Sequence, residues 1–183
     1  MVVATTMSAA EYLATPEDRQ QELIRGEVVV SEPTLPHGHV QTELLFRVRT
    51  WIEEAPGRGY VSTPADIEMD GHNVFAPDLW WVTEDRRPAP AQLLLDGQPD
   101  LVVEIRSPST WIRDPGVKLP AYEASGVAEA WYVDTKARTV LVFRRSDPES
   151  PTFDTRFEVS AEETLTSPLL PGFALEVGTI FGR

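Results

Sequence analysis

An acidic residue interrupts the most apolar stretch of this sequence. Residues 101–105 are mostly branched and apolar, which is typical of a strand inside a sheet with both faces covered. An ionised Glu104 is costly there unless a cation or a hydrogen bond satisfies its charge. The strand stops before Ser107, and open sheets tend to place their sites at strand ends. Two interpretations remain open at this point: Glu104 belongs to a site, or it faces solvent or pairs with an arginine.

Two aspartates that each follow a proline are candidate partners for Glu104. Asp100 lies four residues before Glu104 in one extended run, so their Cα atoms are about 13 Å apart. Ligands of one Mg²⁺ ion must each come within about 2.1 Å of it, which excludes this pair unless the strand bends. Asp78 instead opens another apolar run, at 78–82. If the two strands are neighbours, about 4.8 Å apart, Asp78 and Glu104 meet at one ion and the Ile105 carbonyl supplies a third oxygen. A strand-start cap is the alternative role for Asp78.

Two cations could serve such a site. Arg106 follows Glu104 at the E-x-K spacing of metal-dependent nucleases and lies on the same strand face. An arginine can clamp a phosphate but cannot accept a proton from water, and a salt bridge with Glu104 or another carboxylate is its alternative role. Lys118 lies on an expected helix with Tyr122 one turn further along the same face. It reaches the site if that face points toward Glu104, and otherwise it is a solvated helix lysine.

The remaining polar candidates are weaker. His37 precedes a long expected helix, where a single histidine is more often a cap or a surface residue than a ligand. Glu22 and Glu27 flank an expected turn and are more often solvated than catalytic. The histidines form no HExxH motif, and the absence of cysteine excludes disulfides, thiolate zinc sites and cysteine nucleophiles. Any metal is therefore expected to be a hard ion held by carboxylates.

Composition and charge limit the possible functions. The chain has 183 residues, which suits one domain spanning 1–183. The formal net charge of −13 opposes non-specific nucleic-acid binding, which depends on lysine and arginine contacts to phosphates. It does not exclude an enzyme that brings a metal ion and a local basic patch to a phosphodiester. No apolar run approaches membrane-spanning length and residues 1–10 do not form a secretory signal, so no membrane association and a cytoplasmic location are expected.

Periodicity and turn residues predict the elements that position these side chains. A capping box predicts a helix over 8–13, a Gly-containing turn at 25–26 predicts a hairpin over 22–31, and 33–36 reads as a loop. Helical spacing predicts a long helix over 38–54. Strands are expected within 59–69 and over 78–82, 101–105, 130–134, 139–143 and 153–159, and a surface segment over 83–98. A second helix is expected from Asp114, as its cap, to Ser125, ending at Gly126. This order predicts an α/β (α+β) sandwich around one mixed sheet, without a GxGxxG or P-loop motif.

Many short motifs, in order along nearly the whole chain, resemble one family of bacterial proteins. The sequence is similar to the Uma-type endonuclease family of the PD-(D/E)xK nuclease superfamily. The matching segments are Glu11-Tyr12-Leu13, Glu22-Leu23-Ile24-Arg25-Gly26-Glu27, His37 with Val40 and Leu44, Ala76-Pro77-Asp78, Pro99 to Ile105, Ser107 to Thr110, Asp114 with Lys118 and Tyr122, Gly126-Val127, Trp131 to Asp134 and Leu169 to Gly172.

The resemblance implies a restriction-endonuclease-like core, a mixed central sheet flanked by helices, with the hairpin at its N-terminal side. It implies that Asp78 and Glu104 are catalytic metal ligands. It also implies that the superfamily's lysine has moved to the next helix, at Lys118, so that Arg106 occupies the usual position without being that lysine. Glu27 and His37 match recurrent polar positions of the family without an assigned role.

The expected function is Mg²⁺- or Mn²⁺-dependent hydrolysis of phosphodiester bonds, with DNA as the expected substrate. In this interpretation Asp78, Glu104 and the Ile105 carbonyl hold the ion, Lys118 positions water or offsets phosphate charge, and Arg106 adds local positive surface. Two alternatives remain: an inactive nuclease fold kept as a binding or regulatory module, and a nuclease acting on RNA or nucleotides. A homodimer is expected, with its two-fold contact through the strand pair near Trp131 and the apolar tail.

Overall fold

A six-stranded mixed sheet forms the centre of the molecule. The computed structural model describes residues 6–15, 21–30, 33–92, 94–106 and 114–182. The strand order is β10-β9-β8-β7-β6-β3, in which β7 and β8 are parallel and the other neighbours antiparallel. The strands are β3 (Tyr60–Ser62), β6 (Leu79–Val82), β7 (Leu101–Ile105), β8 (Glu129–Asp134), β9 (Thr139–Arg144) and β10 (Thr155–Val159).

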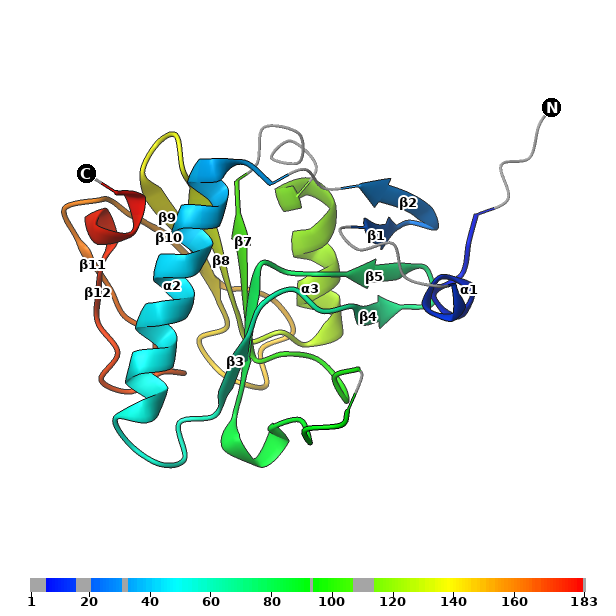
Figure 1. Ribbon diagram of the computed structural model, residues 1–183, viewed down its shortest axis with the longest axis horizontal. Helices are drawn as coiled ribbons and strands as arrows, with labels where there is room; N and C mark the ends of the chain where they lie inside the picture. The colour runs from blue at the N-terminus through cyan, green and yellow to red at the C-terminus, as the bar shows by residue number, and fades with distance from the viewer. Residues whose placement is uncertain (1–5, 16–20, 31–32, 93, 107–113, 183) are drawn as a thin grey trace.

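Helices cover both faces of this sheet (Figure 1). The long helix α2 (Leu35–Glu53) lies on one face, and α3 (Leu119–Ser125) lies on the other after a π-helical turn, η2 (Asp114–Lys118). All five residues of β7 are buried, because each face of this strand meets a core. Leu101, Val103 and Ile105 join the core under α2, whereas Val102 joins the core under α3. Glu104 therefore points to the α3 side of the sheet.

A second, antiparallel sheet lies beside α3 in the order β2-β1-β5-β4 (Figure 1). Its strands are β1 (Gln21–Ile24), β2 (Glu27–Val30), β4 (Ile67–Asp70) and β5 (Asn73–Phe75). The expected hairpin is confirmed, and its turn residues Arg25 and Gly26 have φ angles of 52° and 78°. A two-residue turn with both φ angles positive matches the twist of the strands that it joins. Glu22, on β1 of this hairpin, is buried against Lys118 at the start of α3 rather than exposed to solvent.

The remaining elements are short. Helix α1 (Ala9–Ala14) has the expected capping box between Ser8 and Glu11. A 3-10 turn, η1 (Glu84–Arg86), lies in the surface segment. Near the C-terminus, β11 (Thr164–Leu165) pairs with β12 (Leu175–Glu176), and the 3-10 helix η3 (Val177–Phe181) packs on α2. Within the described ranges no helix is both long and apolar enough to span a membrane.

Three expectations require correction. Helix α2 begins at Leu35, not at residue 38, because proline is tolerated in a first helical turn, where its missing N–H has no partner to lose. The last long strand begins at Thr155 rather than at residue 153. Trp131 and Ile180 are fully buried within this chain, so the expected dimer contact cannot use them.

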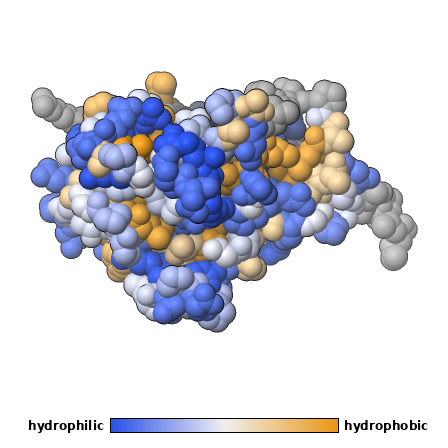
Figure 2. Space-filling view, turned by 90° about the horizontal axis from the view of Figure 1, so that it is seen from below, coloured by the Kyte–Doolittle hydropathy of each residue, from blue (hydrophilic) through white to orange (hydrophobic). Residues whose placement is uncertain are grey.

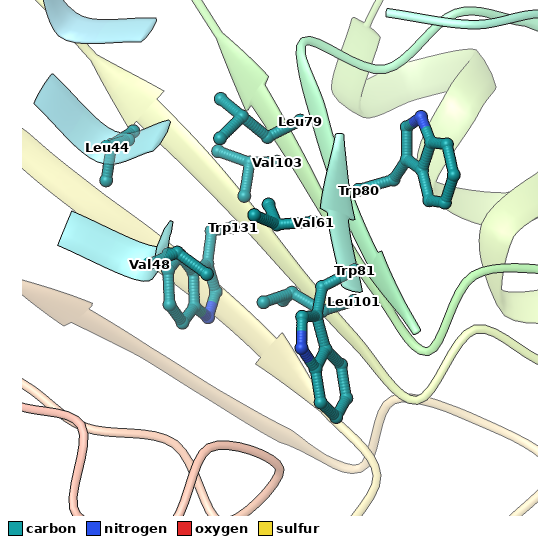
Figure 3. A pocket seen from close by; sticks show the side chains of 9 residues that line it. All are labelled: Leu44, Val48, Val61, Leu79, Trp80, Trp81, Leu101, Val103 and Trp131. Carbon is teal, nitrogen blue, oxygen red and sulfur yellow. The ribbon is translucent and has the colours of Figure 1, made fainter. Parts of the chain in front are cut away.

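The core under α2 is packed closely. A void of only about 10 Å³ in this core is lined by apolar side chains on α2 and four strands (Figure 3). In that view Trp80 points away from Leu79 and Trp81, as alternation along a strand requires. The adjacent tryptophans are thus core residues of two different layers. Seen from below, hydrophilic side chains interrupt the apolar patches of the surface (Figure 2).

Candidate active site

Asp78 and Glu104 lie at the same end of two paired strands. Strands β6 and β7 pair antiparallel with Leu79 opposite Val103, and one further step of that register places Asp78 opposite Glu104. The backbone N–H of Ile105 donates a hydrogen bond to Oδ2 of Asp78 at 2.6 Å. The expectation that these strands are neighbours is therefore confirmed, and the three residues expected to bind a metal lie together.

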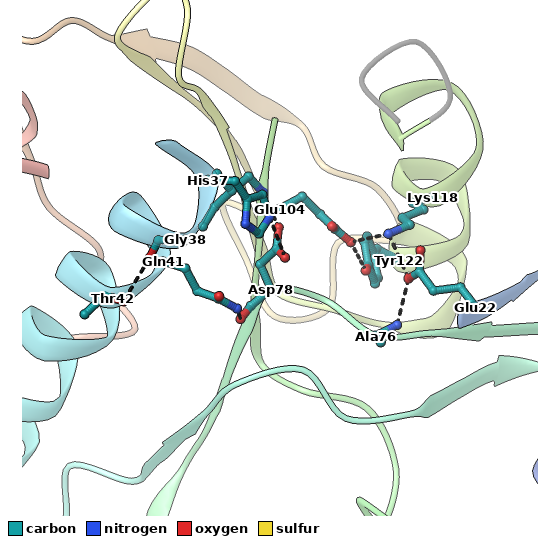
Figure 4. Close-up of polar contacts among 11 residues, drawn as sticks. Glu22, His37, Gly38, Gln41, Thr42, Ala76, Asp78, Glu104, Lys118 and Tyr122 are labelled. Carbon is teal, nitrogen blue, oxygen red and sulfur yellow. Dashed lines mark hydrogen bonds and ion pairs between the residues drawn. The ribbon is translucent and has the colours of Figure 1, made fainter. Parts of the chain in front are cut away.

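Glu104 lies in a buried polar cluster. The Lys118 ammonium is 3.1 Å from Oε1 of Glu104, and the Tyr122 hydroxyl donates to the same oxygen at 2.5 Å (Figure 4). Lys118 and Tyr122 lie one helical turn apart at the start of α3 and so reach Glu104 from one face, as the spacing predicts. Only 4% of Glu104 and 3% of Lys118 is exposed, so both charges depend on these partners.

Burial raises the pKa of Tyr122 well above its ordinary value, and the adjacent Glu104 carboxylate raises it further. Tyr122 therefore stays a neutral hydrogen-bond donor at any working pH. Its hydroxyl can hold Glu104 in place but cannot serve as a phenolate.

Glu22 is the fourth member of this cluster, although its place beside a turn predicted a solvated residue. Its Oε1 lies 2.8 Å from Lys118 Nζ and also accepts a hydrogen bond from the Ala76 N–H at 2.8 Å. Leu23, its neighbour, is buried in a small core with α1, so alternation along β1 turns Glu22 toward α3. The alternation was visible in the sequence. The docking of the hairpin against α3 was not, because no local pattern encodes a contact between segments nearly 100 residues apart.

His37 reaches Asp78 from the other layer. It lies in the first turn of α2, and its Nε2 is 2.9 Å from Oδ1 of Asp78. Gln41, one turn further on, donates to the backbone carbonyl of Asp78 at 2.9 Å. His37 is buried, and its Nδ1 has no hydrogen-bond partner among the described residues. Both oxygens of the Asp78 carboxylate are thus oriented, one by β7 and one by α2.

Arg106 is directed elsewhere. Its guanidinium forms a 2.6 Å ion pair with Asp134 at the end of β8. This contact is the salt bridge with a carboxylate that was the alternative expectation for Arg106. Asp100, the excluded aspartate, pairs with Arg86 and accepts the Thr83 N–H, away from Glu104. Glu27 is exposed on β2, and no described polar contact joins it to the cluster. Ser107 lies outside the described residues.

The cluster has the charge that a divalent cation requires. Counting Glu22, Asp78 and Glu104 as −1 each and Lys118 as +1, and leaving His37 out of the count, gives a net charge of −2. Among the described residues, no three His, Asp or Glu side chains are arranged to hold an ion by themselves. Mg²⁺ is usually held by one or two carboxylates together with other oxygens, and Asp78, Glu104 and a backbone carbonyl fit that requirement.

Comparisons with known proteins identify the family and the fold. The sequence model of the Uma2 family, described as "Putative restriction endonuclease", matches residues 9–178. The fold resembles the crystal structure of a "putative nuclease belonging to DUF820" from Anabaena variabilis ATCC 29413, with a TM-score of 0.79 and 18% sequence identity over 96% of this chain and 97% of that one. At that identity the likeness establishes the fold. No curated protein matches the sequence.

Proposed function

Because the chain belongs to the Uma2 family of restriction-endonuclease-like proteins, we propose that it is a Mg²⁺- or Mn²⁺-dependent endonuclease that hydrolyses phosphodiester bonds in DNA. One observation carries the proposal. Asp78 and Glu104 end two paired strands side by side, and a buried lysine contacts Glu104. Two converging carboxylates and a lysine are the groups that metal-dependent phosphodiester hydrolysis requires.

Each residue of the site has a distinct task. Asp78, Glu104 and the Ile105 carbonyl would hold the cation, which supplies an activated water and offsets charge on the phosphate. The Ile105 N–H and His37 fix the Asp78 carboxylate. Tyr122 fixes Glu104, and the Lys118 ammonium adds a positive charge beside the reacting phosphate. Lys118 acts as a cation, because two carboxylates contact it.

The net charge of −13 favours the main rival, a nuclease fold that binds or regulates without catalysis. The intact set of Asp78, Glu104 and Lys118 opposes it, because burying charges is costly and a binding module has no need of a cation site.

We further propose a homodimer, since two active sites are needed to cut both strands of a duplex in one encounter. Analytical ultracentrifugation at several protein concentrations tests the dimer.

Cleavage assays test the activity. Supercoiled plasmid, single-stranded DNA, RNA and a nucleotide mixture are each incubated with Mn²⁺ and with the wild type, Asp78→Ala or Lys118→Ala. We expect plasmid cleavage by the wild type alone. Equal cleavage by all three proteins would disprove the site. Cleavage of RNA or nucleotides alone would show that DNA is not the substrate. Absence of all cleavage, together with no Mn²⁺ binding by calorimetry, would establish the rival.

A further inference from the structure

Lys118 is held by two carboxylates from different parts of the fold. Glu104 comes from the central sheet and Glu22 from the hairpin, at 3.1 Å and 2.8 Å from Nζ, so the shorter contact is the one to Glu22 (Figure 4). The Phe75 ring lies on the same ammonium, 5.7 Å away. All three charged groups are at least nine-tenths buried. A buried lysine needs one carboxylate to balance its charge, so the second one requires an explanation.

Glu22 is held rigidly in this position. The oxygen that contacts Lys118 also accepts the N–H of Ala76, two residues before Asp78. Glu22 therefore connects the hairpin, the segment that enters β6, and the start of α3. This fixed geometry suits a residue that positions another side chain.

We propose that Glu22 is a positioning residue that holds the Lys118 ammonium and so leaves the charge of Glu104 available to a divalent cation. This inference rests on the function proposed above. Without Glu22, the ammonium would lose the shorter of its two described carboxylate contacts and would compete more strongly with a cation for Glu104. With Glu22, Lys118 keeps a partner while Glu104 shares its charge with an ion. Glu22 also brings the net charge of the cluster from −1 to −2.

Glu22→Gln removes this charge while keeping nearly the same shape, and Glu27→Gln is its matched control on the exposed side of the same hairpin. We expect Glu22→Gln to weaken Mn²⁺ binding, measured by calorimetry, by about tenfold. We also expect a lower kcat with little change in KM for DNA. Glu27→Gln should match the wild type in each measurement.

A double variant separates positioning from a purely structural role. Glu22→Gln with Lys118→Met removes one charge of each sign and returns the cluster to a net charge of −2. We expect this variant to recover Mn²⁺ affinity to within about threefold of the wild type, yet to cleave no DNA. Failure to recover Mn²⁺ affinity would overturn the proposal, because Glu22 would then act on the fold or bind the ion itself.

Lysine labelling gives a readout that needs neither metal nor activity. The sequence contains two lysines, and Lys136 is exposed. In the wild type, an amine-reactive reagent should modify Lys136 quickly and Lys118 slowly, as followed by mass spectrometry. Glu22→Gln should speed the labelling of Lys118 several-fold at a temperature well below the Tm of the variant, where global unfolding does not contribute. If Glu22→Gln leaves both the protection of Lys118 and the Mn²⁺ affinity unchanged, the proposed role of Glu22 is wrong. If the wild type itself binds no Mn²⁺, both the proposed function and the effect of Glu22 on metal binding are wrong.

Discussion

The backbone N–H of Ile105 and the Oδ2 atom of Asp78 form a 2.6 Å hydrogen bond across strands β7 and β6. This bond fixes one carboxylate oxygen of Asp78 beside Ile105, whose backbone carbonyl is the third proposed metal ligand. The metal ligands proposed here therefore lie within β7 and at the residue directly before β6, where the sheet begins to hold the chain. Sites built on strands hold their geometry more closely than sites built on loops.

Asp78→Asn and Asp100→Asn form a matched pair, because each aspartate follows a proline and accepts a backbone N–H. We expect Asp78→Asn to weaken Mn²⁺ binding at least about tenfold, since it removes a charged ligand. Asp100 contacts Arg86 instead of the cluster, so Asp100→Asn should bind Mn²⁺ like the wild type. Calorimetry measures both. Equal losses in the two variants would contradict the assignment of Asp78.

Arg106→Gln tests which cation serves the site. Arg106 pairs with Asp134, whereas Lys118 contacts Glu104. We expect Arg106→Gln to keep the kcat of DNA cleavage within about threefold of the wild type and to lose about 1 kcal/mol of stability with the ion pair. Lys118→Gln should abolish cleavage. Loss of cleavage in Arg106→Gln with normal cleavage in Lys118→Gln would show that Arg106, at the E-x-K position, is the catalytic cation.

Asp134 gives the fold a predictable pH dependence. Burial raises its pKa, but the N–H groups of Ala137 and Lys136 and the Arg106 guanidinium outweigh burial and lower the pKa below its usual range. A lowered folded-state pKa stabilises the fold fully above about pH 4, and this contribution disappears as pH falls through the folded-state pKa.

Asp134→Asn should therefore be less stable than the wild type by about 1–2 kcal/mol at pH 7, and this difference should shrink below about pH 4. Urea unfolding at pH 7 and at pH 3 measures the free energy of unfolding of both proteins. A difference that stays constant over this range would show that the ionised carboxylate of Asp134 does not stabilise the fold.

The elements of this fold were predictable wherever local patterns decide them. Residues 101–105 form a central strand because branched apolar side chains suit burial on both faces. The pairing of Asp78 with Glu104 followed from a simple distance argument that excluded Asp100. Local patterns misplaced the start of β10 and the start of α2, where Pro36 suggested a loop and instead occupies the first helical turn.

Contacts between distant segments were not predictable in the same way. The sequence suggests that Glu22 is solvated, because an acidic residue beside a turn usually is. Its burial depends on how the hairpin docks against α3, which is a tertiary contact without a local signal. The same holds for Glu129, a buried carboxylate bound by Arg144 and Ser167.

Tyr122→Phe tests the hydrogen bond that fixes Glu104. The hydroxyl donates at 2.5 Å to a buried carboxylate, so its removal should cost about 1.5–3 kcal/mol in the free energy of unfolding. Because the pKa of Tyr122 is raised well above its ordinary value, this cost should be the same at pH 7 and pH 9.5. Urea unfolding at the two pH values measures it. A cost that falls at pH 9.5 would mean that Tyr122 ionises.

His37 orients the second oxygen of Asp78, and two substitutions separate this role from simple filling of space. The contact of 2.9 Å requires a proton on Nε2, which then donates to Oδ1 of Asp78. The amide nitrogen of His37→Gln can reach the same oxygen, whereas His37→Ala cannot. We expect His37→Gln to bind Mn²⁺ within about threefold of the wild type and His37→Ala to bind it about tenfold more weakly, because an unfixed carboxylate loses more freedom on binding.

Calorimetry on the two His37 variants measures the Mn²⁺ affinity, and thermal unfolding controls for stability. His37 is buried and its Nδ1 has no partner among the described residues, so His37→Gln loses no hydrogen bond at that atom and can keep the one to Asp78. The glutamine variant should therefore lose less stability than the alanine variant, which leaves a cavity under the start of α2. Equal losses of Mn²⁺ affinity in His37→Gln and His37→Ala would contradict the orienting role of the bond to Asp78. His37 would then contribute to Mn²⁺ binding through its Nδ1 atom, as a ligand.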